Sequence, residues 1–380
     1  MNIGNRIRQA RVAAGLSVRD VAKTVGVSRN AIYRYERGEI MPRASVLVGL
    51  AGAFGVDIEF FFRRTQVELC ASAYRKRSRL GKKQQESIEA RITSSLETYL
   101  SVEDLFPGRI GAEFHVDLGA IKSVSDAESA ADRLRDLWDL GSDPIDSVIF
   151  ALEEHGVKVV VLDKVEGFDG FSCYANHTIP VIAIPAGMAG DRQRFTLAHE
   201  LGHLVLYGSD QRDIEKAAHR FAGAFLAPAK VVIGELGEKR SRLDLTELHI
   251  LKQTYGMSMQ AWVRRAYDLG IISGSYYKAL CRTFGSRGWR KEEPGQPLPE
   301  EKPVRMLLLV HRAVAEGLLT PTAAEEILEH KRMPEVEINE EALAMRAAEA
   351  AALYRSSDEV TEWTKLDQEE FLEYDQMDAD

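Results

Sequence analysis

The chain has 380 residues, of which 45% are hydrophobic and 28% charged. This length and composition predict two or three compact units of a globular protein. No apolar run reaches the roughly 18 residues that a membrane-spanning helix needs, and the first residues lack the apolar core of a signal peptide. The three cysteines form no CxxC pair, which argues against a disulfide framework and a thiolate zinc site. We therefore expect a cytoplasmic protein with no membrane partner.

The net charge of −9 is distributed unevenly along the chain. Residues 1–83 contain 17 Lys and Arg against 6 Asp and Glu, whereas residues 335–380 contain 3 against 15. A basic N-terminal segment on an acidic protein indicates a polyanionic partner for that segment alone. The alternative is a solvated basic surface that has no partner.

Residues 1–62 predict five short helices with recognisable start and stop signals. Ser17 begins the second helix, with Asp20 three residues on as a partial capping box, and Ser28 begins the third. Gly26 makes the tight turn between them. The other three helices are expected from Ile3 to Ala14, from Ala44 to Phe54 and from Asp57 onward. Two helices joined by a short glycine turn form a helix-turn-helix, whose second helix enters the major groove of double-stranded DNA.

Polar side chains on the third helix are of the types that read base edges. Arg pairs bidentately with guanine and Asn with adenine. The residues that we expect to bind DNA are Ser28, Arg29, Asn30, Tyr33, Arg34 and Arg37. Phosphate contacts give affinity but no sequence information. The residues expected to make them are Arg6, Arg11, Lys23, Arg37 and Arg43.

This stretch resembles the Xre/phage-repressor helix-turn-helix family over residues 4–62, through "GLSVRDVAKTVGVSRNAIYRYERGEIMPRASVLVGLAGAFGVDIEFFF". The resemblance implies operator DNA as the partner and a homodimer as the binding form. The family often has a polar, phosphate-binding residue where Val18 stands, which removes one backbone contact. The alternative is a small helical module on the same scaffold that binds protein instead of DNA.

Residues 65–185 predict a helical connector followed by a region of mixed helices and strands. The connector helix runs from Gln84 to Val102, with apolar residues at helical spacing. Two further helices are expected from Ala127 to Asp139 and from Pro144 to His155. Strands are expected from Val157 to Leu162, after the turn at Gly167, and from Val181 to Ile184.

The segment from Gln193 to Leu206 predicts an amphipathic helix that contains the pattern His-Glu-Leu-Gly-His. His199 and His203 are four residues apart, so both imidazoles project from one face at a separation that a zinc ion can bridge. Glu200 lies beside the open coordination position, where it can take a proton from water and later deliver it to a leaving amine. Gly202 suits close packing against a neighbouring strand or the substrate. An HExxH pattern on a helix is typical of metallopeptidases.

A second helix, which begins at Asp213, offers the third metal ligand. Glu215 and His219 are neighbours on one face of this helix because they are four residues apart. We assign Glu215 as the ligand, since two His and one Glu form a catalytic Zn²⁺ set that leaves a site for water. His219 is then expected to orient a liganding imidazole or to stabilise the tetrahedral intermediate. Two alternatives remain: His219 is an ordinary histidine, or it is the ligand and Glu215 lies outside the set.

These motifs resemble the ImmA/IrrE family of zinc metallopeptidases over roughly residues 125–290. The resemblance rests on "GFDGFSCYANHTIPVIAIP", "FTLAHELGHLVLYG" and "EKAAHRFAGAFLAP". It implies a zincin-like core and a Glu ligand matching Glu215, whereas family members commonly have Asn where His219 stands. Several members cleave a partner repressor. Others, with an N-terminal Xre domain, are regulators or antitoxin-like partners of toxins.

The remainder of the chain predicts helices and an acidic tail. A proline-rich break from Gly295 to Pro303 separates a helical stretch from a helical pair, which we expect to dock on the helices before it. The tail is expected to be partly disordered. The predicted division is 1–64 helix-turn-helix domain, 65–110 connector, 111–234 peptidase core, 235–334 helical extension and 335–380 tail.

Together these features predict a multidomain protein with an all-α helix-turn-helix head, an α+β zincin-like core and a helical C-terminal extension. The function expected is a DNA-binding zinc endopeptidase that regulates transcription by cleaving a partner regulatory protein. The main alternative is an Xre-family regulator or type II antitoxin whose peptidase-like domain binds a cognate regulator or toxin without proteolysis. A weaker alternative is a small-molecule sensor. The intact metal pattern favours the enzyme, because a scaffold has no need of Glu200.

Overall fold

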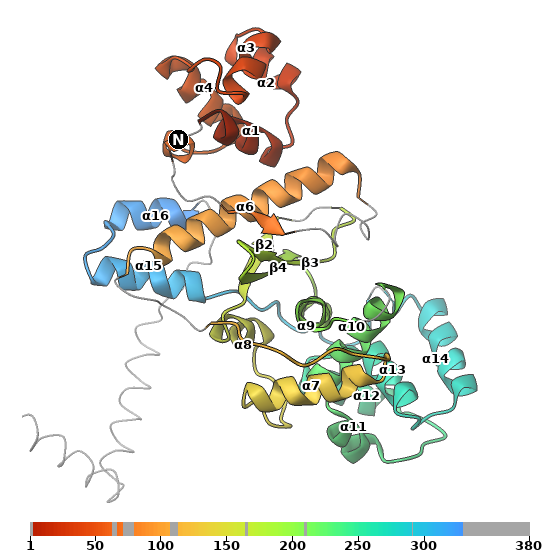
Figure 1. The fold of residues 1–380 in the computed structure, drawn as a ribbon. Helices are drawn as coiled ribbons and strands as arrows, with labels where there is room; N and C mark the ends of the chain where they lie inside the picture. Colours follow the sequence, from red (N-terminus) through yellow and green to blue (C-terminus); the bar gives the residue numbers. More distant parts are fainter. Residues whose placement is uncertain are drawn as a thin grey trace, which may run out of the picture. The chain divides into compact units, whose positions relative to one another are not determined.

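The computed structural model describes residues 3–62, 67–70, 80–106, 113–163, 166–208, 211–290 and 292–329 (Figure 1). The first compact unit runs from Met1 to Leu328. The tail predicted for residues 335–380 lies outside the described residues. Within the described ranges, no helix has both the length and the apolar character that crossing a bilayer requires.

The N-terminal head consists of four α-helices and a 3₁₀ segment around a small apolar core. They are α1 (Ile3–Ala13), α2 (Val18–Val25), α3 (Arg29–Glu36), α4 (Ala44–Phe54) and η1 (Ile58–Phe62). The predicted caps are confirmed: Ser17 and Asp20 form a capping box, and the Ser28 hydroxyl accepts from the backbone N–H of Ala31. Gly26 ends α2 with φ 72°, a conformation that side chains with a Cβ rarely adopt. The predicted fifth helix is instead the short 3₁₀ segment, whose two central phenylalanines are buried in the core of the head.

The connector helix α6 (Lys82–Glu103) contains the predicted segment and packs on a β-sheet along its apolar face. Ile88, Ile92 and Leu96, at helical spacing, are buried against side chains of the sheet. The connector is therefore a structural layer of the core and not a free linker.

The sheet is mixed, and its order is β1-β3-β4-β2. The strands are β1 (Leu69–Cys70), β2 (Lys158–Leu162), β3 (Phe171–Ala175) and β4 (Ile179–Pro185). Strands β2 and β4 are parallel, whereas β3 is antiparallel to both β4 and β1. Asn176 and His177 form the tight β3–β4 turn with positive φ values of 48° and 64°, as the twist of a short hairpin requires. The two-residue β1 was not predicted, because so short a strand carries no alternation signal.

Alternation along the strands divides their side chains between two cores. Val160 and Val181 face the cluster that contains α6, while Val159 and Ile182 face the larger cluster on the other side of the sheet. Helices α8 and α9 cover this second side (Figure 1). The helices of the larger cluster begin with α7 (Asp126–Leu137), α8 (Val148–Glu154), α9 (Gly190–Val205) and α10 (Gln211–Leu226).

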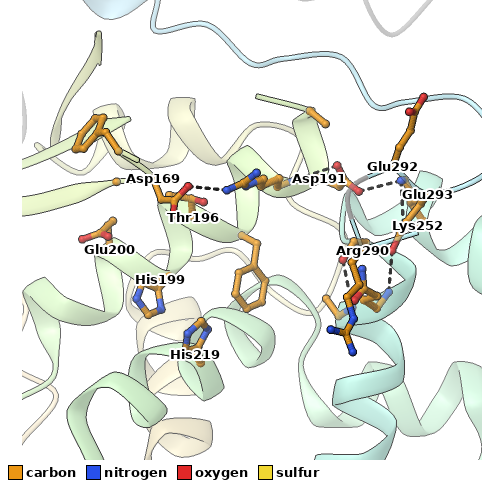
Figure 2. A pocket seen from close by; sticks show the side chains of 18 of the residues that line it. Asp169, Asp191, Thr196, His199, Glu200, His219, Lys252, Arg290, Glu292 and Glu293 are labelled. Carbon is orange, nitrogen blue, oxygen red and sulfur yellow. Dashed lines mark hydrogen bonds and ion pairs between the residues drawn. The ribbon is translucent and has the colours of Figure 1, made fainter. Parts of the chain in front are cut away.

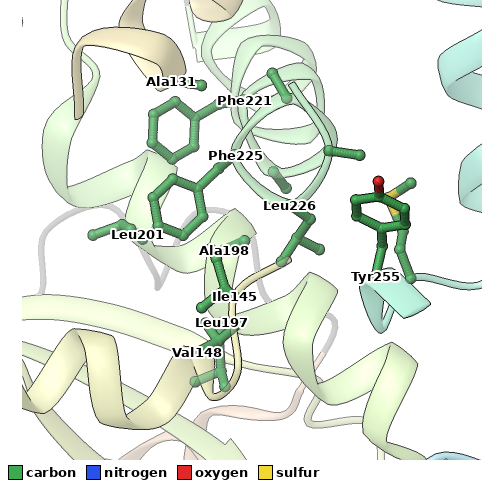
Figure 3. Close-up of a cluster of buried hydrophobic side chains, with 14 of the residues drawn as sticks. Ala131, Ile145, Val148, Leu197, Ala198, Leu201, Phe221, Phe225, Leu226 and Tyr255 are labelled. Atoms are coloured by element: carbon green, nitrogen blue, oxygen red, sulfur yellow. The ribbon is translucent and has the colours of Figure 1, made fainter. Parts of the chain in front are cut away.

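Helices α9 and α10 lie side by side because a glycine separates them. A Cβ at Gly202 would lie 3.2 Å from the Ala218 Cα and 3.2 Å from the Phe221 Cδ1. The close packing predicted for Gly202 is thus against α10 and not against a strand. Phe221 and Phe225 extend from α10 into the core together with Leu201 of α9 (Figure 3). This packing brings α10 alongside the predicted zinc-binding helix.

The remaining helices are α11 (Ala229–Leu236), α12 (Leu245–Tyr255), α13 (Met259–Asp268), α14 (Gly274–Ser286), α15 (Arg305–Ala315) and α16 (Pro321–Glu329). Helix α15 packs against α6, and the Arg312 guanidinium lies 5.0 Å from the centre of the Phe106 ring. The first helix of the predicted C-terminal pair therefore docks on the connector helix, not on the helices that immediately precede the pair. To reach α6, the chain after α14 crosses the start of α9.

Candidate functional site

Helices α9 and α10 bring two imidazoles and one carboxylate together at a single point. His199 and His203 lie one turn apart on α9, with 3.1 Å between their Nε2 atoms. From α10, the Glu215 Oε1 lies 3.2 Å from the His199 Nε2, and its Oε2 lies 3.3 Å from the His203 Nε2. Among the described residues, these three form a group whose donor atoms could share one metal ion.

These separations match the geometry of a tetrahedral zinc site. Ligand atoms about 2.1 Å from a tetrahedral zinc ion lie about 3.4 Å from one another. Hydrogen bonds from His199 and His203 hold the pKa of Glu215 well below its ordinary value, so its carboxylate is anionic at neutral pH. Two imidazoles and one carboxylate are a donor set that zinc binds in peptidases. The residues present therefore fit a zinc ion, although their role as ligands remains a prediction.

A residue of strand β3 positions the Glu200 carboxylate. The Ser172 hydroxyl donates to the Glu200 Oε2 at 2.6 Å. A Cβ at Gly170 would lie 3.1 Å from the Glu200 Oε1, so the glycine leaves room beside that oxygen. Neither residue was predicted from the sequence. Strand alternation was the available signal, since the flanking Phe171 and Cys173 face α6 and Ser172 must face α9.

His219 lies next to the three predicted ligands. Its ring centre is 4.3 Å from that of His199 and 5.9 Å from that of Phe195, and its Nε2 is 3.9 Å from the Glu215 Oε1. The outer edge of the ring is exposed, but desolvation on the inner side and the nearby His199 lower its pKa to about 4. The imidazole is therefore neutral at pH 7. Its ring is tilted by 44° against that of His199, and its predicted catalytic role remains a prediction.

A cavity of about 960 Å³ contains the metal-ligand candidates at one end (Figure 2). Residues at that end are His199, Glu200, His203, Glu215, His219, Phe195 and Ser172. The other end is lined by Asp191, Lys252, Trp289, Arg290, Glu292, Glu293 and Pro297. A cavity of this size is at the upper end of the range of small-molecule clefts, which leaves room for a short peptide segment.

A buried ion-pair cluster fixes the far end of the cavity. The Lys252 Nζ lies 2.8 Å from the Asp191 Oδ2 and 3.0 Å from the Glu293 Oε2. The Glu293 carboxylate also accepts the backbone N–H groups of Met259 and Gln260 at 2.9 and 3.0 Å. A carboxylate at the start of α13 satisfies amides that have no partner within the helix. Because these charges are paired with one another, they stabilise the cavity wall and are not available to bind a ligand.

The segment 292–304 forms part of the same wall and is anchored on α9. Gly190 donates its backbone N–H to Leu298 O at 3.0 Å, and a Cβ at Gly190 would lie 2.1 Å from Pro299 O. The Gln193 carboxamide accepts from Glu301 N at 2.7 Å and donates to Glu301 O at 2.9 Å. The sequence predicted only a proline-rich break here, because pairing across more than a hundred residues leaves no local signal.

In the head, the structure places all the predicted DNA-binding residues on exposed positions. These are Ser28, Arg29, Asn30, Tyr33, Arg34 and Arg37, on or beside α3. On the opposite side of this helix, Ile32 and Glu36 are buried. A polar, exposed face on the second helix of a helix-turn-helix is the surface that DNA-reading proteins use.

The prediction of phosphate contacts is wrong for two of the arginines. Arg6 is buried, pairs with Glu97 of α6 and lies 5.7 Å from the centre of the Phe60 ring. Arg11 binds Glu36 through two hydrogen bonds of 2.5 and 3.1 Å. Buried carboxylates occupy both guanidinium groups, because an unpaired buried charge is strongly destabilising. Lys23 and Arg43, by contrast, are exposed.

Comparison with known families agrees with this division of the molecule. Residues 7–61 match the helix-turn-helix family model, and residues 152–267 match the M78 peptidase model, described as the IrrE N-terminal-like domain. The chain carries an IrrE-like peptidase domain behind a helix-turn-helix domain. This confirms the two families that the sequence motifs indicated. The match to the IrrE-like domain spans the predicted ligands on α9 and α10 and also Ser172 on β3.

Two curated relatives match shorter stretches of the chain. A putative HTH-type transcriptional regulatory protein of Pyrobaculum aerophilum is 44% identical over 55 residues, which are 14% of this chain and 22% of the relative. An uncharacterized transcriptional regulator in the ATPase CF(0) region of Rhodospirillum rubrum is 41% identical over 61 residues, which are 16% of this chain and 56% of the relative. The chain thus spans about a fifth and about half of their lengths.

One solved structure aligns with most of the chain, but its structural similarity to the chain is low. The SHP pheromone receptor Rgg2 of Streptococcus dysgalactiae is 13% identical over 87% of this chain and 98% of the receptor, with a TM-score of 0.15. This TM-score is too low to indicate a common fold.

Proposed function

We propose that the chain is a DNA-binding, zinc-dependent endopeptidase with a zincin-like core. It regulates transcription by cleaving a partner regulatory protein. The observation that carries this proposal is the set of three donors from His199, His203 and Glu215, which lie 3.1 to 3.3 Å apart beside Glu200 in a peptide-sized cavity.

The His199 and His203 Nε2 atoms and the Glu215 carboxylate would hold Zn²⁺. When bound, zinc supplies a Lewis acid that polarises a peptide carbonyl and acidifies water. Ser172 fixes the Glu200 Oε2, so the Oε1 is the oxygen that receives the proton of the attacking water. Glu200 then delivers this proton to the leaving nitrogen. The neutral His219 is adjacent to His199, where its N–H can stabilise the oxygen of the tetrahedral intermediate.

The Ser172 hydroxyl gives this scheme a test outside the metal ligands. We expect Ser172→Ala to lower kcat by about 10–100-fold with little change in KM, since a hydrogen bond to a charged group contributes about 1.5–3 kcal/mol. The rate would be measured on a substrate peptide whose hydrolysis requires zinc. Ser172→Thr keeps the hydroxyl on a strand and should retain most of the activity. Equal losses of kcat in both variants would show that the activity depends on packing at this position and not on the hydrogen bond.

DNA binding by the head is carried by the exposed polar face of α3. Replacing Asn30 by Ala is expected to remove about 1–3 kcal/mol of discrimination at one base position. Selection of bound duplexes from a random pool, with wild-type and variant protein, measures this change. As a control, Lys23→Ala should weaken binding to all duplexes alike and reduce the salt dependence, as loss of a phosphate contact does. An unchanged consensus for Asn30→Ala would contradict base reading by this residue.

The proteolytic proposal is tested by zinc removal in the presence of native substrates. Zinc-loaded protein and chelator-treated protein are incubated with a lysate of the source cells, and newly formed N-termini are identified by mass spectrometry. We expect new N-termini in a regulatory protein only with the zinc-loaded form. The alternative, a binding scaffold for a regulator or toxin, predicts no new N-terminus in either sample.

A further inference from the structure

Helix α14 and the turn that follows it form a surface with basic residues and no acidic ones. From Leu269 to Arg290 the sequence contains no Asp or Glu. Its basic residues are Lys278, Arg282, Arg287 and Arg290, and all four are exposed. Within the described part of the chain, no carboxylate lies within ion-pair distance of Lys278 or Arg282. This set of four residues is called the basic strip below.

The basic strip is continuous along one side of α14. Lys278 and Arg282 are four residues apart, so they occupy the same face of the helix. Gly285 follows Arg282 by three residues on that face, and a Cβ there would lie 3.4 Å from the Arg290 Cζ. Arg290 also donates to Cys281 O at 3.3 Å. The chain after the helix thus folds back so that Arg290 extends the line of Lys278 and Arg282.

The strip ends in the cavity that holds the candidate metal ligands. Arg290 and Trp289 both line it, at the end that also contains Lys252 and Glu293 (Figure 2). The Arg287 guanidinium lies 4.7 Å from the centre of the Trp289 ring, which holds a second positive charge next to the entrance. Arg290 therefore belongs both to the strip and to the lining of this end of the cavity.

Neighbouring carboxylates do not cancel this charge. Glu293 is nearly fully buried and neutralises Lys252 instead. Glu292 is the exposed carboxylate at the cavity end and offsets one of the four positive charges. Free charges at the rim of a site attract oppositely charged partners and speed their association.

Building on the peptidase function proposed for the cavity, we propose that the basic strip binds an acidic segment of the protein that the cavity receives. The partner chemistry is a run of Asp and Glu on the side of the bound peptide that emerges past Trp289 and Arg290. Nucleic acid would also be attracted by positive charge. The continuity of the strip with a peptide-sized cavity, and the separate DNA-reading face on α3, favour the acidic polypeptide.

The experiment measures binding and does not depend on hydrolysis, so it remains informative if the proteolytic proposal fails. Full-length Glu200→Gln protein is titrated against two fluorescent probes, a Glu/Ala peptide and a random-sequence DNA duplex, and a Lys/Ala peptide serves as the charge control. In this background we compare a strip variant, Lys278→Glu with Arg282→Glu, and a head variant, Lys23→Glu with Arg43→Glu. Both change the net charge equally at exposed positions.

We expect the strip variant to bind the Glu/Ala peptide roughly tenfold more weakly and the duplex unchanged, because two attractions become repulsions. The head variant should lose the duplex and keep the peptide. Wild-type binding of the peptide should weaken as salt is added. The proposal is overturned if the Glu/Ala peptide binds no better than the Lys/Ala peptide, if the head variant is the one that loses it, or if the strip variant loses only the duplex. If the strip variant does not fold, Lys278→Gln with Arg282→Gln replaces it and must also bind the Glu/Ala peptide more weakly than wild type, by a smaller factor.

Discussion

Replacing Glu200 by Gln is expected to lower the rate of zinc-dependent peptide hydrolysis by about 10²–10⁴-fold, the usual contribution of a general acid–base group. The carboxamide keeps the shape of the side chain and can still accept the hydrogen bond from Ser172, but it cannot take a proton from water. The zinc content of the protein should stay unchanged, since Glu200 is not among the three donors that lie together. The measurements are kcat/KM and metal stoichiometry on the same samples.

A matched change elsewhere separates this effect from a general one. Glu238 is an exposed carboxylate, and Glu238→Gln should leave both quantities at their wild-type values. Hydrolysis by Glu200→Gln at the wild-type rate would show that another group accepts the proton. Partner binding and gene regulation that persist in a variant without hydrolysis would instead support the scaffold alternative.

Replacing Glu215 by Ala should weaken zinc binding by more than about 100-fold, because the loss of groups that only orient a ligand already costs about 10–100-fold. The affinity is measured by competition with a zinc-binding dye at neutral pH. Zinc should also be released on acidification, because metal ligands bind the ion only in their deprotonated form.

His219→Ala provides the comparison that decides between the two candidate third ligands. If Glu215 is the ligand, the His219 variant should lose no more than about 10–100-fold in zinc affinity, as expected for a group that only orients a ligand, and less than the Glu215 variant loses. A large loss in His219→Ala together with a small loss in Glu215→Ala would reverse the assignment. Among the described residues, Glu215 and not His219 belongs with His199 and His203 to the group whose donor atoms all lie within 4.8 Å of one another, which favours Glu215.

Local signals in the sequence were sufficient for most of the helices and for the two helices that bring the three predicted ligands together. Ser17, Asp20 and Ser28 marked helix starts correctly because capping involves residues only two or three positions apart. The spacing of His199 and His203 placed both imidazoles on one face for the same reason. Glu215 was found by its donor chemistry and by its position on the next helix, and Gly202 then allows that helix to approach.

What the sequence did not reveal depends on pairs that are distant along the chain. Arg6 was assigned to phosphate because its partner Glu97 lies 91 residues further on. The wall of the cavity joins Lys252 to Asp191 and Glu293, and Gln193 to Glu301, and none of these pairs follows a periodic pattern. Ser172 was detectable in principle from strand alternation, but nothing in its own surroundings indicated that Glu200 is its partner.

The central claim is that His199, His203 and Glu215 bind one zinc ion in this protein. Crystals of the zinc-loaded chain, measured on both sides of the zinc absorption edge, test it most directly. We predict one anomalous peak per chain, within about 2.0–2.2 Å of the two imidazole nitrogens and a Glu215 oxygen. A zinc-loaded crystal with no peak there, or with the peak on other side chains, would contradict the metal site and the peptidase function built on it.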